Sequence, residues 1–447
     1  MISFFMRTFA QKLQKVTRLI YVFLLLCACD VSAQTIDSVV VEHYQGRGVQ
    51  ATGGNKLRFY DNGNDKFVDL FEDVRKAKSF VHLEYFNFRN DSIAGLLFKL
   101  LAEKAKEGVE VRALYDSFGN SSNNQPIKRA MHDSICAQGI KLVKYDPIVF
   151  PWVNHIIPRD HRKIVVIDGR VAYTGGMNVA DYYIDGIPGI GEWHDLHMRI
   201  DGPAVDDLQR IFAQIWQKET GEQIAGLKYF PRENGVQMYE EEPSVNAGRT
   251  QNRKFALSLQ KHVDDEAKLL VIDRCSGETS DAIRDLYVTL LDNAQHSVKL
   301  VNPYFVPTHR VRSALKRAVD RGVDVQILLS AKSDIPLTPE AAHYVGNNLM
   351  KRGARVWLFE GGFHHTKLMI VDDCVATVGS SNLDARSLRC DFEVNTLVLS
   401  VPHAQQLVEL FEDQKQSAVE IHKGYWKSRS AWKQFVGWFG NLLTPVL

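Results

Sequence analysis

The chain has 447 residues, of which 45% are hydrophobic and 24% charged, a composition typical of a globular protein with a sizeable core. Its length is too great for a single ordinary domain and suits two domains of about 200 residues. The formal net charge of +1 lacks the strong positive field of a non-specific nucleic-acid binder, so we expect no nucleic-acid partner.

The N-terminal residues 1–33 differ from the rest. Four cations and no acid precede the apolar run LIYVFLLLCAC at 19–29, which is too short for a spanning helix of about 20 residues. It suits the apolar part of a secretory signal, with Val31-Ser32-Ala33 as the cleavage site. A lipoprotein signal with Cys29 lipidated and a short uncleaved anchor remain open. Each alternative predicts a location at the cell envelope, exported or membrane-attached.

The next part of the chain alternates helical and strand patterns. A helix and then a strand are expected over 71–86, a second helix over 93–108 and a second strand over 109–116. Apolar residues at three- and four-residue spacing mark the helices, and Gly108 lies where the second should end. Helices that alternate with continuous apolar strands indicate an α/β sheet covered on both faces.

The motif HRKIVVIDG at 161–169 carries the first candidate chemistry. We expect its apolar run to form a buried strand, so that His161 and Lys163, two residues apart, point to one face. A lysine is a compact charge suited to a phosphate oxygen, and an imidazole can act as a nucleophile or general acid near neutral pH. Asp168, at the far end of the strand, is expected to fix the loop geometry.

Polar residues and glycines follow this motif. The pair Gly175-Gly176 permits close approach of the backbone, and Asn178 can donate hydrogen bonds. The next strand, WHDLHMRI at 193–200, carries Asp195, which we expect to orient or polarise a histidine; a structural role is equally open. The polar segment 236–265 then has the composition of a linker.

The second half of the chain repeats these elements. Helix and strand are expected over 283–305, a helix over 311–322 that ends at Gly322, and a strand over 323–330. The motif HTKLMIVDD at 365–373 follows at a constant offset of 204 residues from the first. The matching pairs are His161 with His365, Lys163 with Lys367, Asp168 with Asp372, Gly175 with Gly379 and Asn178 with Asn382. Glu393, in DFEVNTLVL, takes the place of Asp195.

The constant register indicates an internal duplication in which each copy is one domain, over 50–235 and 266–425. The C-terminal segment 426–447 differs from both copies because it mixes tryptophan and phenylalanine with lysine and arginine. Such an amphipathic segment can lie in a membrane interface or can be an ordinary helix docked on the domain.

The duplication explains why one histidine per copy suffices. Phosphodiester transfer through a covalent intermediate needs one imidazole to attack phosphorus and another to protonate the leaving alkoxide. Two facing copies would supply both, and their two lysines would neutralise the charge of the diester without a metal. No Cys-x-x-Cys pair occurs, which argues against a zinc cluster, and no cofactor is expected.

With both motifs identified, the chain resembles the phospholipase D superfamily, whose signature is a doubled His-x-Lys-x4-Asp, and is most similar to bacterial cardiolipin synthases. The resemblance rests on LYDSFGN (114–120), RDHRKIVVIDGRVAYTGGMNVADYY (159–183), NPYFVP (302–307), HHTKLMIVDDCVATVGSSNLDARS (364–387) and NLLTPVL (441–447). It implies two pseudo-twofold-related domains, each a mixed sheet flanked by helices, with one active site between them. It also implies a phosphohistidine intermediate, no metal, and phosphatidylglycerol as the substrate, with release of glycerol.

The resemblance assigns His161 as nucleophile and His365 as acid/base, within motifs completed by Lys163, Asp168, Lys367 and Asp372. Asn178, Asn382, Asp195 and Glu393 are the expected substrate-binding residues. Tyr85 and Tyr304 lie near the entrance strands, where they could line the pocket or pack in the core.

Two kinds of departure from the family pattern stand out. The family commonly has asparagine where Asp160 and Asp391 stand. Its bacterial synthases often begin with two spanning helices, whereas this chain has one short apolar segment, at 19–29.

Alternative functions stay open. Water in place of an alcohol would make the protein a phospholipase D-type hydrolase of lipid. A nuclease is disfavoured by the low net charge and the aromatic tail. A third alternative is a non-catalytic lipid-binding protein with the same fold.

Overall fold

A computed structural model describes residues 36–147, 157–232, 259, 263–275, 277, 279–335 and 338–442. The expected signal or anchor at 1–33 lies outside the described residues, as does most of the expected linker at 236–265. Within the ranges described, no helix combines the length and the apolar character needed to cross a bilayer.

The helices and strands of the first half agree with the pattern expected over 71–116, whereas the single strand expected over 193–200 is divided into two strands on either side of Asp195. They are β1 (Thr52–Tyr60), α2 (Gly63–Lys76), β2 (Phe80–Tyr85), α3 (Ser92–Lys106), β3 (Glu110–Asp116), α4 (Ser117–Ser122), α5 (Arg129–Cys136), β4 (Lys141–Tyr145), β5 (Lys163–Ile167), β6 (Val171–Gly175), α6 (Tyr182–Asp185), β7 (Glu192–His194), β8 (His197–Asp201) and α7 (Ala204–Thr220). The carboxylate of Asp91 caps α3, and Gly108, with a φ of 91°, follows its end as expected.

The second half repeats this order. It contains β9 (Ala267–Arg274), α9 (Ala282–Asn293), β10 (Ser297–Val301), α10 (His309–Asp320), β11 (Asp324–Ser330), α11 (Thr338–Met350), β12 (Arg355–Phe359), β13 (Gly362–His364), β14 (Leu368–Val371), β15 (Val375–Gly379), α12 (Ala385–Arg389), β16 (Glu393–Leu399), α13 (Val401–Lys415) and β17 (Ala418–Ile421). The short α14 (Tyr425–Ser428) and then α15 (Ala431–Leu442) end the described chain.

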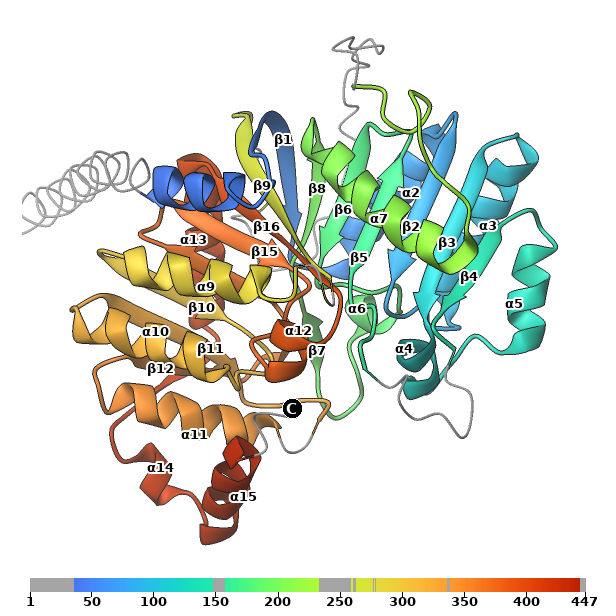
Figure 1. Ribbon diagram of the computed structural model, residues 1–447. Coiled ribbons are helices and arrows are strands. Elements are labelled where there is room, and N and C mark those ends of the chain that lie inside the picture. The colour runs from blue at the N-terminus through green and yellow to red at the C-terminus, as the bar shows by residue number, and fades with distance from the viewer. Residues whose placement is uncertain are drawn as a thin grey trace, which may run out of the picture.

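One 15-stranded sheet runs through both halves (Figure 1). Its order is β17-β12-β11-β10-β14-β15-β16-β9-β1-β8-β6-β5-β2-β3-β4. Outward from the antiparallel pair β1–β9, each half continues with equivalent strands: β8, β6, β5, β2, β3 and β4 on one side, and β16, β15, β14, β10, β11 and β12 on the other. This arrangement confirms the predicted fold class, a duplicated mixed sheet flanked by helices.

The two halves also share a hydrophobic core. Leu208 on α7 and Phe411 on α13 belong to one buried cluster with Val166 on β5 and Ile370 on β14. Burial of apolar area common to both halves stabilises their contact as it would the inside of a single domain. The halves are therefore held together independently of the polar residues between them.

Residues 36–45 form a helix that the sequence did not lead us to expect. This segment precedes β1 of the first half, yet it packs on α9 of the second. The hydroxyl of Tyr44 donates to the carbonyl oxygen of Ala282 at 2.6 Å, and Arg47 pairs with Asp285 at 2.8 Å. The boundary at residue 50 stays a prediction, although the packing ties this preceding segment to the other half.

The motif aspartates hold loops, as their place at the strand ends led us to expect. The carboxylate of Asp168 accepts hydrogen bonds from the backbone N–H groups of Lys78, Ser79 and Phe80 at 2.8, 2.8 and 2.9 Å. That of Asp372 accepts from Gln295, His296 and Ser297 at 3.0, 2.6 and 2.9 Å. Both aspartates adopt positive φ, 53° and 51°. The carboxylate of Asp168 thus holds the turn before β2, and that of Asp372 holds the turn before β10.

This arrangement predicts that Asp372→Ala mainly destabilises the fold. Three amide donors would lose a charged acceptor, which should lower the free energy of unfolding by roughly 2–4 kcal/mol in denaturant titrations. The matched control is Asp320→Ala, which removes an exposed carboxylate whose ion pair among the described residues is with Arg352, and it should change stability by about 0.5 kcal/mol or less. Equal losses in the two variants would contradict a structural role for Asp372.

Candidate active site

The histidines of the two motifs lie just before their strands. β5 begins at Lys163 and β14 at Leu368, so the expected buried strands start only after His161 and His365. The reason is that the backbone of each histidine turns to the opposite half of the molecule. The N–H of His161 donates to the carbonyl of Phe392 at 3.0 Å, and that of His365 to the carbonyl of His194 at 2.7 Å.

His161 is oriented by an acid from the second half. Its Nδ1 lies 2.9 Å from Oε1 of Glu393, which is completely buried at the start of β16. Burial alone would raise the pKa of Glu393, but His161 and Lys163 bring it below its ordinary value, so the group is a carboxylate. A carboxylate only accepts, so Nδ1–H donates and Nε2 keeps a free lone pair. Ser380 donates its hydroxyl to the other oxygen of Glu393.

His365 is oriented in the same way by an acid from the first half. Its Nδ1 lies 2.6 Å from Oδ2 of Asp195, in the turn between β7 and β8. Burial opposes ionisation of Asp195, but Lys367 and His365 hold its pKa below the ordinary value. The ammonium of Lys367 lies 2.7 Å from Nδ1 and 3.1 Å from Nε2 of His365. Among the described contacts, the ammonium of Lys163 does not approach the ring of His161 in this way. Its Nζ instead donates to the backbone carbonyl of His161 at 2.6 Å.

The side chain of Asp195 is shorter than that of Glu393, and the residue packed against each acid differs accordingly. Asp195 lies so close to Gly176 that a Cβ there would come within 2.1 Å of Oδ1. The equivalent residue in the other half is Ser380, which fits under the longer Glu393 and hydrogen-bonds to it. The close backbone approach expected at Gly176 is therefore present, and its cause is the neighbouring carboxylate.

The two lysines and two acids form one electrostatic cluster. The charges of Lys367, Glu393 and Asp195 all act on Lys163. Burial lowers the pKa of Lys163 to about 7 and that of Lys367 to about 8, although the acids oppose the shift. Two buried ammonium groups without full compensation are well suited to bind a phosphate anion.

The pKa of each histidine is lowered as well. Burial lowers the pKa of His161 to about 4, with Glu393 opposing and Lys163 adding to the shift. Burial and then Lys367 lower the pKa of His365. In the site without substrate, both rings are therefore neutral at pH 7, which keeps a lone pair available for nucleophilic attack.

Asn178 and Asn382 follow the glycine turns closely, and their role in binding substrate stays a prediction. Both are 6% exposed, and the side-chain oxygen of each is buried with no hydrogen-bond partner among the described residues. An unsatisfied buried amide is costly and indicates a missing partner. Either amide can serve a phosphate oxygen through its NH₂ or a hydroxyl through its oxygen.

Aromatic side chains enclose His365. The rings of Trp193, Phe363 and Tyr304 have centroids 5.4, 5.5 and 5.9 Å from the imidazole. Tyr304 thus borders the site, whereas Tyr85 is fully buried, as expected for core packing. The enclosing rings on β7 and β13 were missed by the sequence analysis, because no periodic pattern marks such short strands.

Lys66 is a further residue that the sequence did not single out. It is fully buried on α2, and its Nζ contacts the Tyr85 hydroxyl at 3.3 Å and the Asn178 carbonyl at 3.4 Å. Burial lowers its pKa to about 7, while Asp195 opposes the shift. A lysine at a core position of an amphipathic helix was the only signal available in the sequence.

The departures at Asp160 and Asp391 are also explained. Burial, followed by the charge of Glu84, raises the pKa of Asp160 well above its ordinary value, which favours the protonated carboxyl. A protonated carboxyl has one donor and one acceptor, as the family's asparagine does. Asp391 accepts from the backbone N–H of Arg159 at 2.9 Å and from Arg386 at 2.7 Å.

We predict that His161 titrates below 6.5 and carries its proton on Nδ1 at pH 7. Nitrogen chemical shifts in ¹⁵N-histidine-labelled protein would measure both, with His161→Gln to assign the signal. Glu393→Gln should lower the pKa of His161 further, because the carboxylate charge opposes the shift caused by burial. Glu420→Gln, at an exposed position, should leave it unchanged. An imidazolium at pH 7 would contradict the prediction.

Comparisons with known proteins agree with this geometry. A family described as "Cardiolipin synthase, PLD-like domain" matches residues 70–216 and 287–415. A cardiolipin synthase of Staphylococcus aureus is 32% identical over 399 residues, covering 89% of this chain and 74% of the relative. Cardiolipin synthase 1 of Bacillus anthracis is 28% identical over 403 residues, covering 90% and 74%.

Among solved structures, phosphatidylserine synthase of Haemophilus influenzae has the same fold. It aligns with a TM-score of 0.63 at 13% identity, over 88% of this chain and 95% of that one. The repeated domains, the doubled motif and the similarity along most of the sequence lead to one conclusion: the chain belongs to the cardiolipin synthase family of phospholipase D-like proteins.

Proposed function

We propose that the protein transfers the phosphatidyl group of one phosphatidylglycerol molecule to a glycerol hydroxyl of another, releasing glycerol. The relatives named cardiolipin synthase support the reaction class. The observation that carries the proposal is the crossed pairing of His161 with Glu393 and of His365 with Asp195. It provides two oriented imidazoles in one cluster with two ammonium groups.

In the first step, Nε2 of His161 attacks phosphorus. A P–N bond forms, the P–O bond to glycerol breaks, and His365 gives its proton to the departing glycerol oxygen. The negative charge of a bound phosphodiester opposes the lowered pKa of His365 and favours its protonated form. In the second step, His365 takes the proton of the acceptor hydroxyl. The acceptor oxygen attacks phosphorus, and the P–N bond breaks to restore His161.

The contrast between the histidines supports this order. The Lys367 ammonium lies 3.1 Å from Nε2 of His365, the nitrogen that keeps a lone pair when Nδ1–H donates to Asp195, and this contact makes the ring a poorer nucleophile. Within the described part of the chain His161 has no such contact, and its side chain is 13% exposed, compared with 8% for His365. Lys163 and Lys367 would hold the phosphate oxygens, with Asn178 and Asn382 completing the hydrogen bonds.

Transfer rather than hydrolysis requires that an alcohol reaches the phosphohistidine before water does. The aromatic rings around His365 limit the access of water and suit a lipid acceptor. Lipid substrates of this kind lie in bilayers, so we extend the proposal to a membrane-associated enzyme of the cell envelope. The expected N-terminal signal or anchor is part of that proposal.

We expect His161→Ala and His365→Ala each to reduce formation of cardiolipin from phosphatidylglycerol by at least about 10³-fold, because each removes one chemical role. Product analysis of lipid extracts, without added metal, would measure the loss. His309→Ala on α10, outside the cluster, is the matched control and should retain activity. Phosphatidic acid as the sole wild-type product would instead indicate hydrolysis, and surviving transfer in His161→Ala would contradict the mechanism.

The pKa shifts predict a pH profile. The ammonium groups, with pKa values of about 7 for Lys163 and about 8 for Lys367, lose their charge as the pH rises. The protonated fraction of His365, whose pKa is lowered by burial and by Lys367, also decreases as the pH rises. We therefore expect kcat/KM to be highest at or below neutral pH and to fall above it.

On the acid side, kcat/KM should hold below pH 6.5, because His161 stays neutral down to a pKa of about 4. Initial rates in overlapping buffers would measure both limbs of the profile. A rise in kcat/KM from pH 7 to 9 would be inconsistent with the proposal.

A further inference from the structure

The last helix, α15, has an arrangement opposite to that of a core-facing helix. Its largest apolar side chains point outward: Trp432 is 70% exposed, Phe435 49%, Trp438 45%, Phe439 42% and Leu442 52%. Its buried residues are Gly437 and Gly440. A Cβ at Gly437 would lie 2.5 Å from the carbonyl oxygen of Glu340, so the helix backbone rests directly on α11. An amphipathic helix of a soluble domain normally buries its aromatic face instead.

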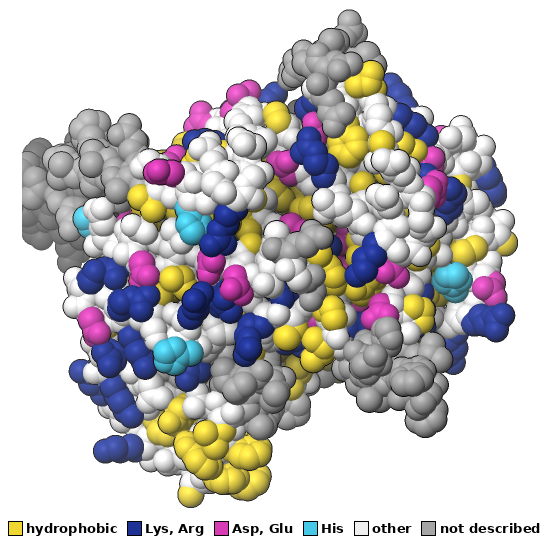
Figure 2. All heavy atoms as spheres, viewed as in Figure 1, with side chains coloured by type: hydrophobic (Ala, Val, Ile, Leu, Met, Phe, Trp, Pro, Cys, Tyr) yellow, Lys and Arg dark blue, Asp and Glu magenta, His cyan; other side chains and the backbone are white. Residues whose placement is uncertain are grey.

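The outward aromatic residues form a contiguous patch at the lower left of the molecule (Figure 2). The surrounding chain is basic. Residues 421–442 contain Lys423, Lys427, Arg429 and Lys433 and no acid. Exposed tryptophan and phenylalanine flanked by lysine favour the boundary between lipid headgroups and acyl chains.

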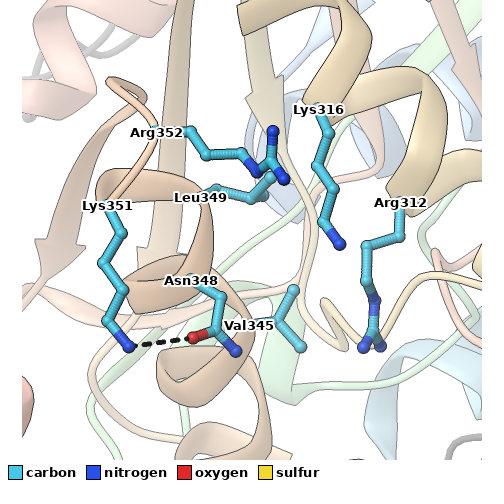
Figure 3. A pocket seen from close by; sticks show the side chains of 7 residues that line it. All are labelled: Arg312, Lys316, Val345, Asn348, Leu349, Lys351 and Arg352. Carbon is cyan, nitrogen blue, oxygen red and sulfur yellow. Dashed lines mark hydrogen bonds between the residues drawn. The ribbon is translucent and has the colours of Figure 1, made fainter. Parts of the chain in front are cut away.

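A basic pocket of about 280 Å³ lies beside this patch, between α10 and α11 (Figure 3). Four cations line it, Arg312, Lys316, Lys351 and Arg352, and no carboxylate does. Of these four cations, only Arg352 forms an ion pair within the described part of the chain, with the exposed Asp320 at 2.8 Å. The pocket thus presents net positive charge suited to an anion.

Arg312 connects the pocket to the helix. Its guanidinium donates to the side-chain oxygen of Asn441 on α15 at 2.7 Å and to the carbonyl of Pro307 at 3.2 Å. Its Nε is buried and has no partner within the described part of the chain. Arg312 is half-buried, and its contacts among the described residues are with neutral acceptors, so its charge is not compensated there and an anion in the pocket would compensate it.

We propose that α15 and this pocket form one docking surface for an anionic phospholipid bilayer. The aromatic side chains of α15 enter the interface, and the pocket takes the phosphate of a lipid headgroup. Figure 1 places α15 at the lower edge of the molecule, on the same side as α6, β7 and α12. Because Trp193 on β7 borders His365, docking would orient the catalytic site toward the bilayer. The inference rests on the proposed function only for the presence of lipid substrate in that bilayer.

Fluorescence quenching by brominated phospholipids tests the position of α15. The full-length protein with His161→Ala, which prevents turnover, would be mixed with vesicles of brominated phosphatidylcholine and phosphatidylglycerol. Trp432 and Trp438 are the two tryptophans classed as exposed within the described ranges. We expect quenching to fall by more than about half in Trp432→Phe/Trp438→Phe, which keeps the aromatic character but removes the reporters. Unchanged quenching would overturn the proposal, since it would assign contact with lipid to another segment.

Replacement of charges tests the pocket. Lys316→Gln/Lys351→Gln should raise the phosphatidylglycerol concentration for half-maximal quenching about tenfold, because each lysine near an anionic surface contributes to binding. The matched control, Lys99→Gln/Lys106→Gln on α3, removes two lysines from the other half and should leave that concentration nearly unchanged. Equal shifts in the two variants would indicate net charge alone and would overturn the assignment of the pocket.

A second copy of the chain is the alternative occupant of the aromatic patch. In sedimentation, Trp432→Ser/Phe435→Ser should have the same mass as the parent protein. Lipid docking would be overturned if the parent were a dimer and the variant a monomer, and if brominated phospholipids did not quench the fluorescence of the parent. Transfer activity toward detergent-solubilised phosphatidylglycerol separates this inference from the proposed function. In the catalytically competent chain, the variants of the docking surface should keep that activity while they lose activity on vesicles.

Discussion

The crossed pairing of histidine and carboxylate is the constraint on which the site depends. Each imidazole belongs to one half of the molecule, and the acid that orients it belongs to the other. Neither half alone can hold its histidine in a defined tautomer, because its partner oxygen would be missing. The shared hydrophobic core and the central β1–β9 pairing therefore have a catalytic consequence: they fix the distance across which these hydrogen bonds form.

The two half-sites are equivalent in plan and different in chemistry. The shorter acid, Asp195, lies against Gly176, whereas the longer Glu393 lies against Ser380. Among the described contacts, an ammonium touches the ring of His365 but not that of His161. Burial lowers the pKa of both histidines, and the charges near the two rings differ, which supports the two different roles that we propose for them. Duplication of one motif thus yields two histidines in different environments, which the proposed division into nucleophile and acid/base requires.

The surface of the second half carries the features that we propose for docking to a membrane. Glycines allow α15 to lie against α11 with its aromatic face outward, and a guanidinium links that helix to a pocket lined by cations. A lipid substrate has to enter from a bilayer, and a surface that combines exposed aromatic rings with uncompensated positive charge suits this environment. The low net charge of the chain conceals this local concentration of cations.

The sequence by itself determined the duplicated α/β fold, the helices and strands around each motif, and the membership of His161, Lys163, His365 and Lys367 in the candidate site. The spacing of apolar residues and the constant offset between the two motifs encode these features, because the features depend on residues close together in the chain. Only the tertiary structure decided that Glu393 serves His161 while Asp195 serves His365, that Lys66 lies beneath the site, and that α15 turns its aromatic residues outward. Such features depend on contacts between segments as many as 232 residues apart, and no local pattern in a single sequence records which distant side chains will meet.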